Sequence, residues 1–155
     1  GVSYGAVCPD GEWGDRFLAE IQGRYDPSRV HFTGSLPYSQ FISLLQLSAC
    51  HVYLTYPFVM SWSLLEAMAC GCAVVGSDTA PVREMIRDGH NGLLVDFFSP
   101  ADLAAAVEEL LKDRERAAAF GAAARATVER PYDLDACVSR HLALMNLIAS
   151  GGIAD

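Results

Sequence analysis

Short, almost uninterrupted apolar runs alternate with helical patterns along the first two thirds of the chain. Three of these runs cover His51–Tyr56, Ala73–Gly76 and Gly92–Val95, and a fourth covers Val30–Gly34. Strands without polar alternation are typical of parallel sheets whose two faces are both covered by helices. The pattern therefore predicts an α/β, Rossmann-like parallel sheet of about four strands, incomplete, over roughly residues 30–95.

The segments between and after these runs have helical periodicity. Ser99 is a suitable N-cap with Pro100 at the first helical position, and a helical C-terminal tail is expected over about residues 99–150. The segment before about residue 14 is rich in Gly, Pro and Asp and is expected to be a loop. Other helices are expected at about Trp13–Arg24, Pro37–Leu47, Ser63–Cys70, Pro81–Arg87, Arg114–Arg130 and Asp133–Ser150.

Length and composition limit the classes of protein. The chain has 155 residues, of which 52% are apolar, which suits a single α/β domain over residues 1–155. No apolar run approaches the roughly 20 residues that a membrane span needs, so we expect a cytoplasmic protein. A formal net charge of −8 argues against nucleic acid as a partner. The five cysteines lack paired metal-ligand spacing, so no metal site is expected.

A helix that begins near Ser61 carries the most specific chemistry. It follows an apolar strand, so its first backbone N–H groups, at Ser61, Trp62 and Ser63, are expected to face the ligand edge of the sheet and suit a diphosphate. Glu66, one turn further, is placed to accept both hydroxyls of a ribose. A capping box between Ser63 and Glu66 explains the same spacing without a ligand. Trp62 itself is either a stacking ring or a core anchor.

Three motifs occur in order: Val30-His31-Phe32-Thr33-Gly34, Leu65-Glu66-Ala67-Met68-Ala69-Cys70-Gly71 and Asn91-Gly92-Leu93-Leu94-Val95. Together they resemble the C-terminal, donor-binding domain of family 4 (group 1) glycosyltransferases of the GT-B architecture. The resemblance implies transfer of a sugar from a nucleotide-sugar donor, linked to uridine or guanosine diphosphate, to an acceptor hydroxyl with retention of configuration. It implies no cofactor and no bound metal.

The resemblance also assigns individual positions. Glu66 corresponds to the family's ribose-binding glutamate, Trp62 and Ser63 to amides at the donor diphosphate, and Leu36 to the backbone that holds the base. Phe58 stands where relatives carry a second glutamate that touches the donor sugar, and Met60 lies beside it. Sugar recognition is therefore expected to differ from the common pattern. The identity of the catalytic residues stays open.

Parts of the family's machinery have no counterpart in these 155 residues. Relatives begin this domain with a strand, a helix and a strand that bring an Arg and a Lys to the phosphates, and they add an N-terminal acceptor-binding domain. We therefore expect a partial domain that is inactive alone and needs that N-terminal domain or a partner chain. An acceptor in a peripheral membrane setting stays open. The alternatives are a noncatalytic interaction module descended from a glycosyltransferase and a sugar-nucleotide epimerase.

Overall fold

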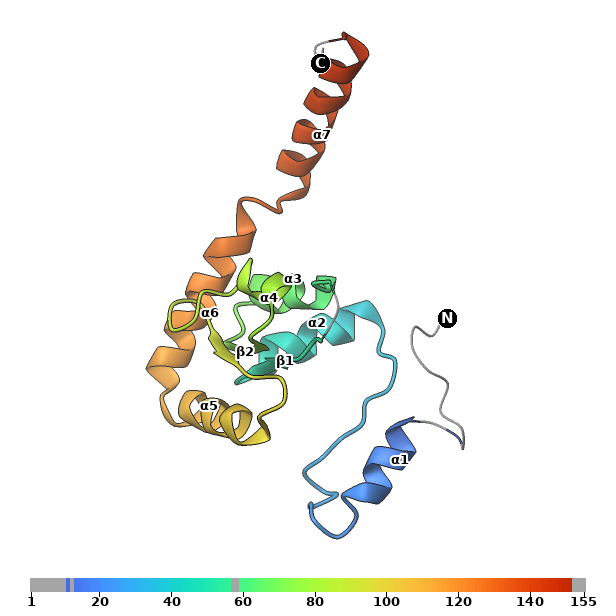
Figure 1. The fold of residues 1–155 in the computed structure, drawn as a ribbon, viewed down its shortest axis with the longest axis vertical. Coiled ribbons are helices and arrows are strands. Elements are labelled where there is room, and N and C mark those ends of the chain that lie inside the picture. Colours follow the sequence, from blue (N-terminus) through green and yellow to red (C-terminus); the bar gives the residue numbers. More distant parts are fainter. Residues whose placement is uncertain (1–10, 12, 57–58, 152–155) are drawn as a thin grey trace. The chain divides into compact units, whose positions relative to one another are not determined.

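The computed structural model describes residues 11, 13–56 and 59–151, and the chain divides into two units, residues 1–36 and 37–155 (Figure 1). In the first unit, α1 (Trp13–Glu20) ends earlier than the predicted Arg24. The ring of Trp13 stacks on Phe17 at 5.8 Å between centroids, and the guanidinium of Arg16 lies over Trp13. None of the residues of α1 is buried.

The prediction of a buried strand at Val30–Gly34 is wrong. These residues have no strand conformation, and the side chain of Phe32 is 66% exposed. A strand needs a neighbour to accept and donate its backbone hydrogen bonds, and no described segment pairs with residues 30–34. Gly34 has a φ of 58°, which lies in the left-handed region that favours glycine.

The second unit contains a parallel sheet of three strands, instead of the four predicted, among the residues that the structure describes. Its order is β1 (His51–Tyr53), β2 (Val74–Ser77) and β3 (Leu93–Val95). His51 is in register with Val74, and Val75 with Leu93. All four residues of β2 are buried, as expected for a central strand with both faces covered.

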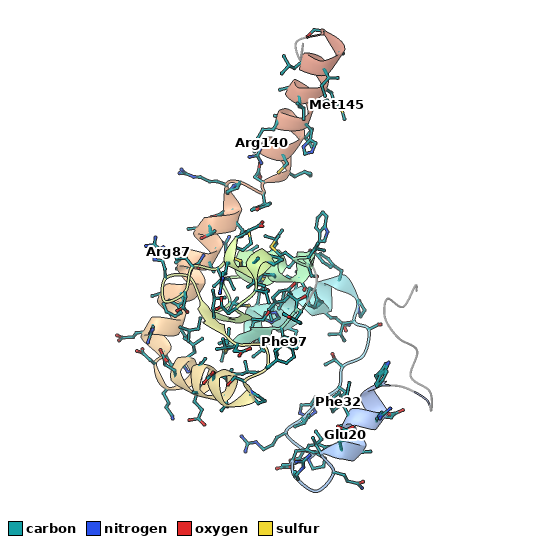
Figure 2. All side chains as sticks on the ribbon, viewed as in Figure 1. Glu20, Phe32, Arg87, Phe97, Arg140 and Met145 are labelled. Carbon is teal, nitrogen blue, oxygen red and sulfur yellow. The ribbon has the colours of Figure 1, made fainter. Side chains whose placement is uncertain are left out.

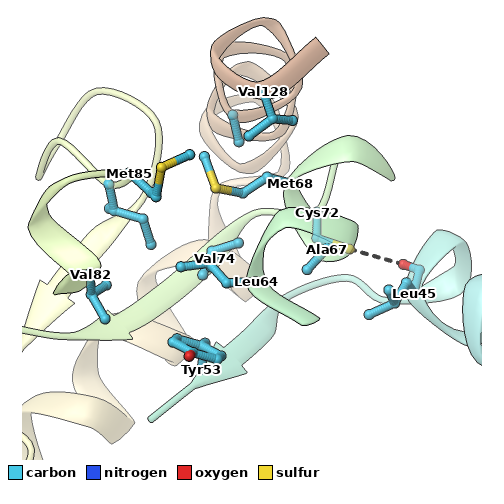
Figure 3. Packing of buried hydrophobic residues seen from close by; sticks show 12 residues of the cluster. Leu45, Tyr53, Leu64, Ala67, Met68, Cys72, Val74, Val82, Met85 and Val128 are labelled. Carbon is cyan, nitrogen blue, oxygen red and sulfur yellow. Dashed lines mark hydrogen bonds between the residues drawn. The ribbon is translucent and has the colours of Figure 1, made fainter. Parts of the chain in front are cut away.

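Helices before and between the strands cover one face of this sheet. They are α2 (Tyr38–Leu47), α3 (Trp62–Ala69) and the short α4 (Ala80–Arg83). Their apolar side chains enclose Val74 of the central strand, and Leu64 and Met68 of α3 are completely buried there (Figure 3). The thiol of Cys72 joins this core and donates a hydrogen bond to the Leu45 carbonyl over 3.1 Å. Burial raises the pKa of Cys72 to about 11, so the thiol stays protonated at neutral pH.

The opposite face is covered by α5 (Pro100–Lys112) and the first half of α6 (Arg114–Glu129). Val75 points to this side, because successive residues of a strand face opposite sides of a sheet. Ser99 caps α5 as predicted, and its hydroxyl accepts the N–H of Asp102. Asp113 caps α6 in the same way through the N–H of Arg116.

The second half of α6 packs against α3 on the first face, so α6 contributes to both cores. Gly121 makes this possible. A Cβ at that position would lie 2.1 Å from the carbonyl oxygen of Gly71, which terminates the turn after α3. Only a residue without a side chain allows the two backbones to approach so closely.

The last helix, α7 (Leu134–Ala149), follows a short break after α6 and is capped by Asp133. None of its residues is buried, although it carries several apolar side chains. Figure 1 shows α7 extending beyond the layer formed by α3 and α6 within this unit. In the described part of the chain, no helix combines the length and apolarity needed to cross a bilayer.

Candidate functional site

The candidate site lies where β1 leads into α3, at the carboxyl edge of the parallel sheet. Ser61 is the N-cap of α3, and its Oγ accepts the N–H of Ser63 over 3.3 Å. The N–H of Ser61 in turn donates to the phenol oxygen of Tyr53 over 2.8 Å. Two of the three amides expected to face a diphosphate are therefore already bonded within the protein. Among the described residues, none accepts the N–H of Trp62.

The capping box predicted as the alternative role for Glu66 is absent. The helix begins at Trp62, two residues earlier than that motif requires, and the N–H of Ser63 is held by Ser61. Glu66 instead faces Tyr38 at the start of α2. A hydrogen bond to the Glu66 carboxylate, with its negative charge, raises the pKa of the Tyr38 phenol. Glu66 therefore lies near the start of α2 and forms no capping box with Ser63.

A cavity of about 720 Å³ opens beside this carboxylate, between α3 and the junction of α6 with α7. We call it the α3–α7 cavity. Met60, Trp62 and Glu66 line one wall. The opposite wall comes from the end of α6 and the start of α7 and consists of Val128, Glu129, Tyr132, Asp133, Leu134 and Cys137. A volume of this size is within the usual range for small-molecule sites.

Trp62 and Met60 play different parts in this wall. The side chain of Trp62 is 82% exposed, so it is not a core anchor. Met60 is half-buried and packs against the core under α3. Met60 and Glu66 both line the cavity, and the predicted place of Met60 beside the donor sugar stays a prediction.

The charge of the cavity wall restricts what it can hold. Its ionisable carboxyl groups belong to Glu66, Glu129 and Asp133, and no basic side chain lies among the described lining residues. Glu129 pairs with Arg125, Asp133 accepts the N–H of Ala136, and the rest of the wall is mainly apolar. The wall therefore offers hydroxyl groups a carboxylate at Glu66, and its lining residues offer phosphate no cation. A diphosphate would therefore have to lie toward the N-terminus of α3, where the helix dipole favours negative charge.

The roles predicted for Leu36 and Phe58 stay predictions. Leu36 belongs to the first unit, whereas Glu66 belongs to the second, and Phe58 lies outside the described residues. Among the described residues, no three His, Cys, Asp or Glu side chains form a group suited to a metal ion.

Tyr38 and Tyr132 were missed by sequence reasoning, although both lie at the site. Tyr38 is separated from Glu66 by the whole of α2 and β1, and Tyr132 comes from the far end of α6. No local pattern links these positions, because their proximity depends on how α2 and α6 pack against α3. The break after Pro131 signals only that a helix ends there.

Comparisons with known proteins show the family of this chain. Residues 3–127 match the family described as glycosyl transferases group 1. An uncharacterized glycosyltransferase of Methanocaldococcus jannaschii is 26% identical over 75% of this chain and 30% of its own length. The α-maltose-1-phosphate synthase of Mycolicibacterium smegmatis is 45% identical over 39% of this chain and 17% of its own.

Solved structures share the fold. Sucrose-phosphate synthase from Thermosynechococcus elongatus superposes with a TM-score of 0.78 at 23% identity, over 88% of this chain and 34% of that one. Anabaena HepE, in complex with UDP-glucose, superposes with a TM-score of 0.76 at 21% identity, over 89% and 37%. The chain thus spans about a third of the length of these proteins, and it shares the fold of the part of each that it matches. With the family match covering most of its residues, the chain belongs to the group 1 glycosyl transferases.

Proposed function

We propose that this chain supplies the donor-binding part of a retaining glycosyltransferase, which moves a hexose from a nucleotide sugar to an acceptor hydroxyl. One observation carries the proposal. Glu66 lines a ligand-sized cavity that begins at the N-terminal end of α3, the helix that follows the carboxyl end of β1, and it forms no capping box with Ser63.

The carboxylate of Glu66 has the capacity for this role. Two carboxylate oxygens offer about four acceptor positions, so the Tyr38 phenol and two ribose hydroxyls can be bound together. Tyr38 would hold the carboxylate in one orientation before the nucleotide arrives. The N–H of Trp62 and the N-terminus of α3 would then face the phosphates, which places Ser61 and Ser63 in supporting roles as caps.

The remainder of the donor site is proposed to lie outside these 155 residues. A diphosphate carries charge that the acidic cavity wall does not balance, so basic groups must come from elsewhere in the longer enzyme. The chain covers about a third of its structural neighbours, which leaves room for an acceptor-binding domain. We therefore expect negligible transfer by the isolated chain. A uridine or guanosine nucleotide is proposed as donor, and HepE in complex with UDP-glucose supports the former.

Calorimetric titration with UDP and GDP tests the site, in this chain and in a longer natural protein that contains it. We expect saturable binding by the longer protein, weakened about tenfold by Glu66→Gln, because two charge-assisted hydrogen bonds become weaker neutral ones. The same substitution should hardly affect an analogue that lacks both ribose hydroxyls, since Glu66 then has nothing to bind.

A Glu108→Gln variant is the matched control, because Glu108 is an exposed acid on α5 that pairs with Lys112. It should bind both nucleotides like the wild type. Saturable binding in neither protein, or an equal loss with and without the ribose hydroxyls, would contradict the proposal.

A noncatalytic interaction module is the second candidate, and α7 favours it. This helix buries none of its residues and exposes apolar side chains along its length, as a helix that binds a partner does. A longer natural protein that binds no nucleotide, but requires α7 to form a complex, would support this candidate over the first.

A further inference from the structure

Three aromatic side chains gather at the carboxyl ends of the outer strands, apart from the cavity wall that bears Glu66. Tyr56 follows β1, and Phe97 and Phe98 follow β3. The rings of Tyr56 and Phe97 stack at 5.6 Å between centroids with an interplanar angle of 28°. Phe98 stands edge-on to both, at 5.1 Å from Tyr56 and 5.0 Å from Phe97. We call this arrangement the aromatic corner.

Exposure distinguishes the aromatic corner from a core cluster. Phe98 is 69% exposed and Tyr56 is 55% exposed, whereas Phe97 is half-buried between them. Figure 2 marks Phe97 beside the loop that leads from β3 to α5. The two outer rings thus present apolar surface at the edge where parallel sheets bind ligands.

Hydrogen bonds fix the backbone on both sides of the corner. The buried hydroxyl of Ser77 accepts the N–H of Thr55 over 3.0 Å and donates to the Thr55 carbonyl over 2.9 Å, which holds the residue before Tyr56. Asp96 accepts the N–H of Phe98 over 2.9 Å. A site held in this way loses little conformational entropy when it binds a ligand.

A polar pair follows β2, the strand between β1 and β3. Asp78 follows β2, and its N–H donates to the Val95 carbonyl over 2.7 Å, which ties it to the end of β3. Arg83 binds both carboxylate oxygens of Asp78, at 2.5 and 2.7 Å, and both side chains are partly exposed. The backbone of Asp78 is thus bonded two residues before Phe97. Carboxylate and guanidinium groups bind the hydroxyls of a pyranose, and an aromatic ring packs on its apolar C–H face.

We propose that the aromatic corner and the Asp78–Arg83 pair form a saccharide subsite, in which a pyranose packs its C–H face on Tyr56 or Phe98 and its hydroxyls reach the ion pair. The choice of a saccharide rests on the proposed function, whereas the position of the subsite rests on the ring and ion-pair geometry. The sugar belongs either to the donor or to a glycan acceptor. Both have the same ring chemistry.

Nuclear magnetic resonance of the full chain with methyl α-glucopyranoside and methyl α-mannopyranoside tests the subsite. We expect saturable shifts at the ring signals of Tyr56, Phe97 and Phe98, and saturation transfer concentrated on one face of the sugar. Phe98→Ala should weaken this binding about fivefold, the amount that one aromatic contact provides.

Two further variants separate the effect of the aromatic ring from that of apolar bulk and serve as controls. Phe98→Leu preserves apolar bulk but removes the ring, so it should lose as much affinity as the alanine variant. Phe32→Ala removes a ring that is 66% exposed in the first unit and should leave glycoside binding unchanged. Glycosides that cause no saturable shift at the three rings, or a Phe98→Leu variant that binds like the wild type, would overturn the proposal.

The source of the sugar follows from a nucleotide comparison in the longer natural protein. If the corner holds the donor sugar, Phe98→Ala lowers the affinity for UDP-glucose but not for UDP. If it holds the acceptor, the affinity for both nucleotides stays the same while binding of the glycosides falls, and either result supports the subsite. Loss of nucleotide binding in Glu66→Gln is a separate measurement, so failure of the donor site and failure of this subsite can be told apart.

Discussion

Asn91 shows how much one side chain can contribute to this fold. The sequence Asn91-Gly92 is typical of a tight turn, yet Asn91 is only 2% exposed and bonds to three groups. Its Oδ1 accepts the N–H of Arg87 over 2.7 Å, while Nδ2 donates to the Met85 carbonyl and to Thr127 Oγ1 over 3.0 and 3.1 Å. It therefore ties the turn before β3 to α6, a role that no local turn pattern reveals.

Replacement of Asn91 by alanine should destabilise the second unit by about 2–3 kcal/mol, because it leaves buried donors and acceptors without partners. Urea denaturation followed by circular dichroism measures the change. Asn146→Ala, in the exposed α7, is the control and should change the free energy of unfolding by less than about 0.5 kcal/mol. Equal stability of the two variants would show that the Asn91 bonds contribute nothing net.

At the scale of elements, the contact between α6 and the turn after α3 depends on Gly121. Alanine is a better helix former than glycine by about 1 kcal/mol, so Gly121→Ala would stabilise an isolated helix. Here the added Cβ would lie 2.1 Å from the Gly71 carbonyl oxygen. The cost of this overpacking should exceed the gain in helix propensity, so the free energy of unfolding should decrease by about 1–3 kcal/mol.

Gly14 in α1 is the matched control for this substitution. A Cβ there meets no atom within 4 Å, so Gly14→Ala should increase the stability of its helix. Opposite signs for the two variants in thermal melting are the expected result. Stabilisation by Gly121→Ala would show that α6 can shift away from Gly71 at little cost.

Prediction from the sequence succeeded where the signal is local. The strands at β1, β2 and β3 and the cap at Ser99 were recognised from runs and spacings a few residues long. Val30–Gly34 has the same apolar character but forms no strand, because pairing depends on a distant segment. For the same reason the sequence predicted the helix that carries Glu66, but not Tyr38 or the α7 side of the cavity.

At the scale of the whole molecule, the chain has a formal net charge of −8, and protonation of its acids lowers the mutual repulsion of these charges. Hydrogen bonds from Arg83 and Lys112 lower the pKa values of the Asp78 and Glu108 carboxyl groups, so each stays charged to a lower pH than a free carboxyl group does. Burial of His51, a residue of β1, lowers its pKa below the ordinary value of 6.5, because the charged ring would lose water.

This shift predicts a loss of stability as the pH falls below about 6.5. Above that pH the ring is neutral in both states and His51 contributes no pH dependence. Below it, the unfolded chain binds a proton that the folded chain does not, so the free energy of unfolding decreases until the pH reaches the folded-state pKa. Melting temperatures measured between pH 7.5 and 5, a window of about two units around the ordinary histidine pKa, should fall in the wild type and fall less in His51→Gln. His90→Gln, which alters an exposed ring, is the comparison. An unchanged slope in His51→Gln would assign the loss to the other ionisable groups of the molecule.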